Sequence, residues 1–179
     1  MDHEIKIEYF KTKFGELIIG SFENKLCLCD WRYRKMRNSV DKNLKNRLNA
    51  DFIVESTAIS QKTKNQLNEY FEGQREEFDI PLYLVGSDFQ KSVWKTLQKI
   101  PYGETDTYLE LSKKIGNQKA IRAVARANGE NAISIIIPCH RIIGSDGGLV
   151  GYAGGINVKK RLLKIETKKP NSEQLRLFN

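Results

Sequence analysis

The residues best suited to chemistry lie together in one short segment, Pro138-Cys139-His140-Arg141. Isoleucine runs flank this segment on both sides, at residues 135–137 and 142–143. Reactive side chains inside an apolar run are locally inconsistent, and such places tend to be functional or strained sites. A cysteine thiol, with an ordinary pKa of about 8.5, needs a base or a positive neighbour to act as a nucleophile. Because His140 and Arg141 follow Cys139 directly, and Pro138 can turn the chain, the segment is compatible with a cysteine nucleophile.

A cysteine beside a histidine is also compatible with three different roles. Cys139 could be a buried apolar residue, with His140 capping a turn. It could also be the nucleophile of a cysteine hydrolase, which needs a third group to orient the histidine, and Asn131 or Glu166 could supply that group. A metal site fits least well, because the chain has two histidines and no second cysteine pair at zinc-finger spacing. We therefore expect no metal and no cofactor.

The composition of the whole chain is typical of a soluble intracellular protein. With 179 residues, 40% hydrophobic content and a formal net charge of +8, one or two folded domains are expected and extensive disorder is excluded. No run approaches the roughly 20 apolar residues of a membrane helix, and the chain begins without a signal-peptide pattern. An odd count of three cysteines favours a reducing, cytoplasmic setting, with Cys27 and Cys29 on one face of a strand. The positive charge favours a polyanionic partner such as nucleic acid.

Two short helices are predicted before the reactive segment. Thr107 and Glu110 have the spacing of a capping box, Gly116 ends the first helix, and Asn117 can cap a second helix that runs to about Asn128. Two short helices joined by a glycine-containing turn are typical of a helix-turn-helix unit. The second helix has a basic face of small residues, formed by Lys119, Arg122, Ala123 and Arg126. Its inward face is expected to hold Ile121, Val124 and Ala125. A nucleic-acid backbone could approach the basic face closely, although a solvated surface helix would have the same pattern.

The first part of the chain is predicted to be a sheet with a helix. Alternating residues between 5 and 31 predict an antiparallel meander of strands. The basic run at 32–48 predicts a solvated loop and helix, or a contact with phosphate. A helix is predicted at 58–71 and a short closing strand at 76–84.

A domain boundary is predicted near residues 85–87. A capping box at Ser87 and Gln90 then begins a helix. The packed face of this helix is expected to hold Phe89, Val93, Trp94 and Leu97. A last helix is predicted at 157–166 and a flexible tail at 169–179.

The segment from Ile135 to Ile143 closely resembles the active-site signature of the O6-alkylguanine-DNA alkyltransferases, also called methylated-DNA–protein-cysteine methyltransferases. The resemblance runs from about Phe89 to Glu166. It includes four further motifs: Pro101-Tyr102-Gly103-Glu104-Thr105, the helix at 119–124, Ala127-Asn128-Gly129-Glu130-Asn131 and Gly151-Tyr152-Ala153-Gly154-Gly155. The first part of the chain resembles the family through its strand pattern and Tyr70-Phe71-Glu72-Gly73.

The resemblance implies an α+β fold. An N-terminal antiparallel-sheet domain, ribonuclease-H-like, would span residues 1–86, and a mainly helical domain with the helix-turn-helix would span 87–168. It also implies a monomeric DNA repair protein that binds double-stranded DNA carrying alkylated bases. Such a protein moves an alkyl group from O6 of guanine, and in many members O4 of thymine, onto its own cysteine in a single-turnover reaction.

By resemblance, Cys139 accepts the alkyl group. His140 would deprotonate Cys139 through a water molecule, and Glu166 would orient His140. Asn131 would organise the turn around the site, and Tyr108 would donate a proton toward the base ring, which makes the purine a better leaving group.

The resemblance also assigns the contacts with DNA. Because the target atom is inaccessible in a duplex, the nucleotide must be flipped out, and Arg122 would fill the gap that it leaves. The other predicted DNA contacts are Lys119, Ala123, Arg126 and Arg141. The predicted pocket residues are Pro138, Ile142, Tyr152 and Ala153. Two positions depart from the family pattern: Ala153 stands where serine is frequent, and Asp106 stands where a hydrophobic or basic residue is more usual.

Two further hypotheses concern partners. Alkyltransferase-like proteins bind alkylated DNA without a reactive cysteine, and this binding-only class is the alternative function. In the tail, Gln174-Leu175-Arg176-Leu177-Phe178 resembles the short peptide with which bacterial repair proteins contact the replication sliding clamp.

Overall fold

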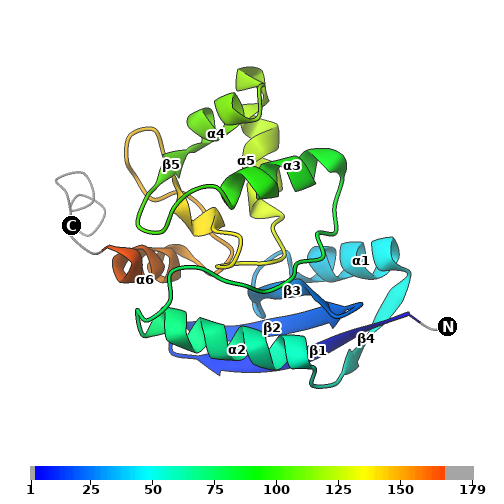
Figure 1. The fold of residues 1–179 in the computed structure, drawn as a ribbon. Helices are drawn as coiled ribbons and strands as arrows, with labels where there is room; N and C mark the ends of the chain where they lie inside the picture. Colours follow the sequence, from blue (N-terminus) through cyan, green and yellow to red (C-terminus); the bar gives the residue numbers. More distant parts are fainter. Residues whose placement is uncertain (1–2, 168–179) are drawn as a thin grey trace.

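A computed structural model describes residues 3–167 of the chain (Figure 1). Its first part is a four-stranded sheet with the strand order β3-β2-β1-β4. Strands β1 (His3–Thr12), β2 (Gly15–Phe22) and β3 (Lys25–Trp31) form the expected antiparallel meander. Strand β4 (Ala50–Val54) pairs in parallel with β1, so the complete sheet is mixed. The residue pattern does not predict β4, because buried and exposed positions do not alternate along it.

Helices cover both faces of the sheet. Helix α1 (Arg37–Leu48) packs on one face through Val40 and Leu44. Helix α2 (Ala58–Phe71) packs on the other face through Leu67 and Tyr70. The cluster that contains α2 continues into the second part of the chain through Trp94, Leu111, Ile137 and Leu162. The sheet and the helical part therefore share one hydrophobic core.

The two cysteines of β3 lie on different faces of the sheet. Both are buried, as expected, but Cys27 packs in the cluster under α1 and Cys29 in the shared core. The register of β2 and β3 shifts between Gly20 and Ser21, where Cys27 is the extra residue of a bulge. Because a bulge reverses the alternation of side chains, the prediction of a common face is wrong.

The predicted strand at 76–84 is a single bridge between Leu26 and Leu82. Leu26 donates to the carbonyl of Pro81 and accepts from Tyr83, both at 2.8 Å. Pro81 has no N–H group to continue a ladder, which is why the pairing stays this short.

The second part of the chain is mainly helical (Figure 1). Helix α3 (Asp88–Leu97) begins with the predicted reciprocal capping box of Ser87 and Gln90. Phe89 does not share its packed face, because it lies in the exposed first turn, whereas Val93, Trp94 and Leu97 are buried. Helix α4 (Tyr108–Lys114) begins at Thr107, whose side chain accepts from the Glu110 amide.

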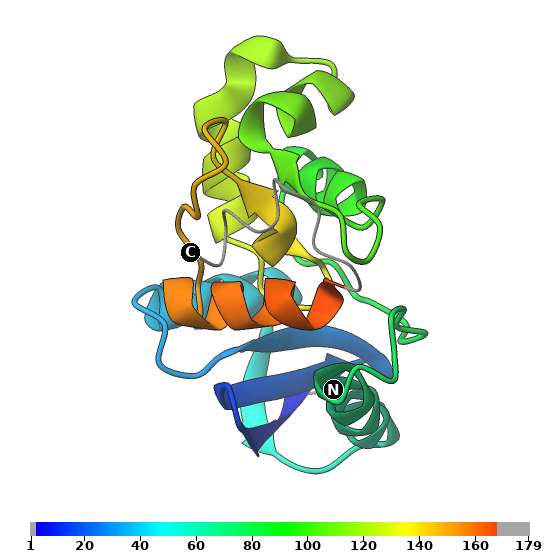
Figure 2. The same ribbon diagram turned by 90° about the vertical axis from the view of Figure 1, so that its left-hand side faces the viewer.

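The second helix of the helix-turn-helix, called the recognition helix below, has two segments. A 3-10 turn, η1 (Gln118–Ala120), leads into α5 (Ile121–Gly129). Val124 and Ala127 are buried, whereas Ile121 is exposed, contrary to prediction. The turn between α4 and α5 lies at the end of the molecule farthest from the sheet (Figure 2), and residues 121–123 in the first turn of α5 are exposed.

The remaining elements frame the reactive segment. Strands β5 (Asp106–Thr107) and β6 (Ile142–Ile143) pair in parallel, η2 (Cys139–Arg141) is a 3-10 turn, and α6 (Ile156–Glu166) ends the described chain. Asp106, the unusual acidic residue, is nearly buried and pairs with Lys114 at 2.6 Å. No helix within residues 3–167 is long and apolar enough to cross a membrane. The predicted tail at 169–179, with the clamp-like peptide, lies outside the described residues.

Candidate active site

The reactive segment is held in a tight, irregular turn. Pro138 precedes the 3-10 turn η2, so Cys139 and His140 do not alternate as they would in a strand. Ile135 has a φ of 72°, which is an outlier for a β-branched residue. Such strain is typical of functional sites, where it costs about 1–3 kcal/mol and is held by surrounding contacts.

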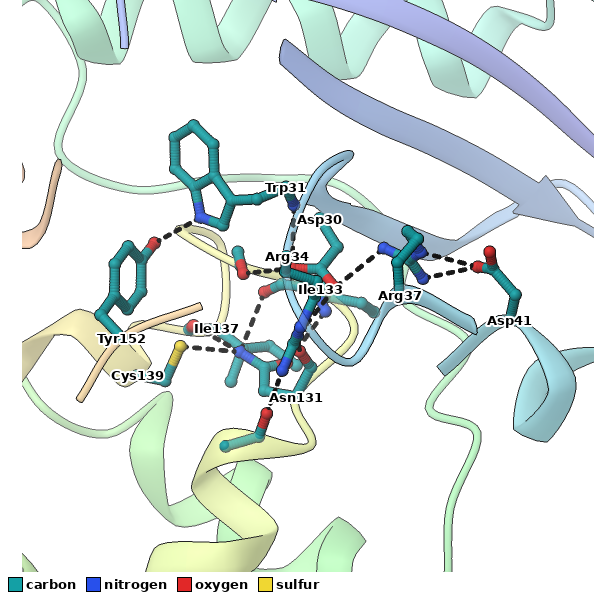
Figure 3. A network of polar contacts seen from close by, with 12 residues as sticks. Asp30, Trp31, Arg34, Arg37, Asp41, Asn131, Ile133, Ile137, Cys139 and Tyr152 are labelled. Atoms are coloured by element: carbon teal, nitrogen blue, oxygen red, sulfur yellow. Dashed lines mark hydrogen bonds and ion pairs between the residues drawn. The ribbon is translucent and has the colours of Figure 1, made fainter. Parts of the chain in front are cut away.

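Asn131 contacts the sulfur of Cys139 directly. Its Nδ2 lies 3.2 Å from Sγ and also donates to the carbonyl of Ile137 at 3.0 Å, while its Oδ1 accepts from the Ile133 amide at 2.9 Å (Figure 3). Burial raises the pKa of the Cys139 thiol, and the hydrogen bond from Asn131 opposes this shift. Asn131 is therefore a donor placed to stabilise a thiolate.

His140 and Glu166 form a buried pair. The His140 Nε2 atom lies 2.7 Å from Oε1 of Glu166, and both side chains are almost completely inaccessible. Burial lowers the pKa of His140, whereas the Glu166 carboxylate opposes that shift. The other ring nitrogen, Nδ1, is buried and has no hydrogen-bond partner among residues 3–167, so Glu166 leaves Nδ1 available for a proton.

Two further side chains hold the Glu166 carboxylate. Arg141 donates to Oε2 at 2.9 Å and to Oε1 at 3.1 Å, and Tyr70 of α2 donates to Oε1 at 2.7 Å. Burial opposes ionisation of Glu166, but His140 and Arg141 together hold its pKa well below the ordinary value. The prediction that Arg141 contacts DNA is therefore wrong, because Arg141 is buried and balances this carboxylate.

Cys139 opens into a cavity of about 640 Å³. Tyr108 lines it with Cys139, and so do Tyr152 and Ala153, two of the four residues predicted for the pocket. Pro138 and Ile142 do not, because both are buried outside it. Helix α5 contributes the walls formed by Ala125, Asn128 and Gly129. The loop between β3 and α1 contributes Tyr33, Arg34, Lys35 and Met36, which no local motif distinguishes within the basic run.

The hydroxyls of Tyr108 and Tyr152 in the cavity keep their protons at neutral pH. Burial raises the pKa of Tyr108, and the charge of Cys139 raises it further. Burial also raises the pKa of Tyr152, whose hydroxyl accepts from Trp31 Nε1 at 3.1 Å (Figure 3).

Lys159 is a buried cation that the sequence motifs do not reveal. Its Nζ donates to the carbonyls of Ile142 and Val150, the latter at 2.6 Å. Burial lowers the pKa of Lys159 to about 8, while the charge of Cys139 opposes this shift. With a pKa of about 8, Lys159 still carries its positive charge at neutral pH, and this charge favours a thiolate at Cys139.

The basic face of the recognition helix remains exposed. Lys119 in η1 and Arg122, Ala123 and Arg126 in α5 are all exposed, and Arg126 pairs with Glu130 at 2.9 Å. Helix α5 therefore carries exposed basic residues and also forms a wall of the cavity, because Ala125 and Gly129 follow Arg122 on the same side of the helix. Within residues 3–167, no three metal-ligating side chains are grouped closely enough to hold a metal ion.

Both parts of the chain are similar to known proteins of one family. Two family models match: 6-O-methylguanine DNA methyltransferase, ribonuclease-like domain, over residues 5–84, and its DNA binding domain over residues 88–168. The methylated-DNA–protein-cysteine methyltransferase of Methanosarcina barkeri is 55% identical over 159 residues, which are 89% of this chain and 95% of the relative. The constitutive enzyme of Bacillus subtilis is 38% identical over 165 residues, 87% of this chain and 92% of the relative.

Solved structures give the same result. The crystal structure of Mycobacterium tuberculosis O6-methylguanine methyltransferase matches with a TM-score of 0.77 and 38% identity, over 98% of this chain and 99% of that chain. A crystal structure of the M. tuberculosis protein in complex with DNA matches with a TM-score of 0.77 and 37% identity over the same shares. The chain therefore belongs to the methylated-DNA–protein-cysteine methyltransferase family.

Proposed function

We propose that this protein repairs DNA by moving an alkyl group from O6 of guanine onto Sγ of Cys139, once per molecule. The observation that carries the proposal is the cavity at Cys139, because α5 forms one of its walls and carries the exposed Arg122 one turn before the wall residue Ala125. A guanine inside a duplex cannot reach a buried thiol, so the nucleotide must leave the stack, at a cost of about a few kcal/mol. Arg122 fills the gap in the duplex, and the flipped base enters the cavity.

The reaction is a displacement at the alkyl carbon. The Cys139 thiol proton passes through a bridging water to Nδ1 of His140, while Glu166 holds the resulting imidazolium at Nε2. The thiolate, held by Asn131, forms the S–C bond as the C–O bond to guanine breaks. Tyr108 donates a proton toward the departing base, which its raised pKa permits at neutral pH. The thioether is stable, so the protein is consumed.

Lys119, Ala123 and Arg126 contact the DNA backbone beside Arg122. Binding of this kind releases counterions, so affinity should fall steeply with salt. Tyr152 and Ala153 line the pocket for the base, and the backbone donor at Ala153 remains although alanine lacks the hydroxyl of a serine. Repair of O4-alkylthymine, a monomeric state and the sliding-clamp contact of residues 174–178 stay predictions.

Intact-mass measurement after incubation with a duplex that contains one O6-methylguanine tests the proposal. We expect a gain of one methyl group, mapped to the Cys139 peptide. Cys139→Ala should bind the same duplex without gaining mass, and Cys27→Ala, a second buried cysteine variant, should still be methylated. Methylation of Cys139→Ala would refute the assignment, and a released product with unmodified protein would show a hydrolase instead.

A further inference from the structure

A buried ion pair joins the sheet to the turn that carries Asn131. Asp30, at the end of β3, is completely buried. Its Oδ2 accepts from Arg34 at 2.8 Å and from Arg37 at 3.0 Å, and its Oδ1 accepts from Ser134 at 3.0 Å (Figure 3). Ser134 belongs to the turn before Cys139, so this carboxylate is shared between the two parts of the chain.

Arg34 extends this pair to the end of α5. Its guanidinium donates to the carbonyl of Asn131 at 3.1 Å and to the carbonyl of Gly129, the last residue of the helix. The last carbonyls of a helix have no partner within it, so a buried cation there satisfies them. One planar guanidinium thus contacts a carboxylate and two carbonyls at once, a geometry that lysine cannot reproduce.

Asn131 is thus held at both ends. Arg34 fixes its backbone carbonyl, and its side-chain amide contacts Sγ of Cys139 at 3.2 Å. Figure 3 shows these contacts as one continuous network from the helix α1 side to the sulfur. Arg37 is a natural comparison, because it pairs with the same Asp30 carboxylate and with Asp41 but makes no contact with the turn among the described residues.

We propose that Arg34 is a positioning residue for alkyl transfer, which holds Asn131 so that its amide donates to the Cys139 thiolate. The inference rests on the proposed function, because it assigns the sheet part of the chain a role in setting the reactivity of that nucleophile. Besides Asn131 and the base His140, the charged and titratable groups around Cys139 are Asp30, Arg34, Lys159, Tyr108 and Tyr152. Of these, Arg34 alone also fixes the donor itself.

The test compares three full-length variants: Arg34→Met, Arg34→Lys and Arg37→Met. Two rates are measured against pH for each: methyl transfer from an O6-methylguanine duplex, and alkylation of Cys139 by iodoacetamide, both followed by mass. The iodoacetamide rate reports the thiolate without DNA. If the wild-type protein shows a normal thiolate titration but transfers no methyl group, the proposed function fails and the positioning role is still measured.

Losing a hydrogen bond to a charged group should shift the thiolate titration of Arg34→Met upward by about one pH unit, with transfer at neutral pH slower by about tenfold. Arg34→Lys keeps the charge but loses the planar guanidinium that contacts Asp30 and two carbonyls at once. We therefore expect its thiolate titration and transfer rate to resemble those of Arg34→Met. Arg37→Met should stay within about threefold of the wild type. If Arg34→Met does not fold, Arg34→Lys decides. A wild-type titration for Arg34→Lys, or an equal shift in Arg37→Met, would overturn the proposal, because the effect would then come from charge near Asp30.

Discussion

Replacing Tyr70 with phenylalanine would remove one hydroxyl group from the core and leave its ring in place. The Tyr70 ring packs against Phe71, Phe78 and Tyr102, with ring centroids 5.6 to 6.3 Å apart. Its hydroxyl donates to Oε1 of Glu166 at 2.7 Å. The hydroxyl also lies 3.5 Å from Nε2 of His140, a much longer contact. Because the ring contacts survive, Tyr70→Phe tests mainly the hydrogen bond to the buried carboxylate.

The size of the effect follows from the charge of the acceptor. A hydrogen bond to an ionised group contributes about 1.5–3 kcal/mol to stability. For a chain of this length, each kcal/mol shifts Tm by about 2–4 °C, so Tyr70→Phe should lower Tm by about 3–12 °C. His140 and Arg141 still hold the carboxylate, so the variant should fold.

The stability difference should also depend on pH. The folded-state pKa of Glu166 lies below its unfolded value of about 4.3, so the ionised carboxylate stabilises the fold above about pH 5. This stabilisation is lost as the pH falls through the folded-state pKa. Removing a donor makes the pKa difference smaller, and the unfolded state is the same in both proteins. The gap between wild type and Tyr70→Phe should therefore be constant down to the folded-state pKa of Glu166 in the variant, which lies below about 4.3, and shrink as the pH falls through that pKa.

Thermal unfolding at pH 7 measures the change in Tm. Urea unfolding at pH 7 and at several lower pH values measures how the difference in unfolding free energy depends on pH. Tyr9→Phe is the matched control, because Tyr9 is exposed on β1 and its variant should stay within about 0.5 kcal/mol of the wild type. The reasoning is refuted if Tyr70→Phe is as stable as Tyr9→Phe at pH 7. It is also refuted if the loss does not shrink in acid, since the hydroxyl would then not act on an ionised Glu166.

Three other variants test the site. Arg122→Ala should weaken binding to an O6-methylguanine duplex by about tenfold, measured by fluorescence anisotropy, because nothing then fills the stack. Tyr108→Phe should slow methyl transfer by about a hundredfold with DNA affinity unchanged, and an unchanged rate would exclude Tyr108 as the proton donor. Burial lowers the pKa of Lys159 from 10.5 to about 8, so between these values the unfolded chain binds more protons and stability rises with pH. Relative to Lys159→Met, the wild type should therefore gain up to about 3 kcal/mol over that range in urea unfolding, and a flat difference would exclude a lowered pKa for the buried Lys159 amine.

Short-range patterns predicted much of this molecule because they are written in neighbouring residues. The capping residues Ser87 and Thr107 begin the helices that they were expected to begin. The Cys139-His140 pair identified the reactive turn for the same reason. The bulge at Cys27 has no such signature. It changes the face of the sheet to which the following side chains point, so alternation alone wrongly predicts a common face for Cys27 and Cys29.

Local sequence patterns do not show which charged residues are buried. A basic residue has the same letter whether it faces DNA or balances a buried carboxylate, which is why Arg141 was assigned to DNA. The partners that decide the matter lie far away in sequence: Tyr70 is 96 residues from Glu166, and Arg34 is 97 residues from Asn131. No periodicity links positions at such separations, so these contacts emerge only from the fold.

Both long-range contacts run from the sheet part of the chain to the reactive turn, and this has a consequence for how the nucleophile works. Residues 87–167 alone would keep Cys139, His140, Glu166 and the basic face of α5. They would lose the hydrogen bond from Tyr70 to Glu166, which helps to hold the His140–Glu166 pair. They would also lose the hydrogen bond from Arg34 to Asn131, which donates to the thiolate. Because a buried carboxylate and a buried thiolate need paired groups to offset their desolvation, loss of these two contacts would weaken the chemistry without changing the exposed basic residues of α5. The sheet part is therefore best understood as the rigid body against which the reactive turn is set.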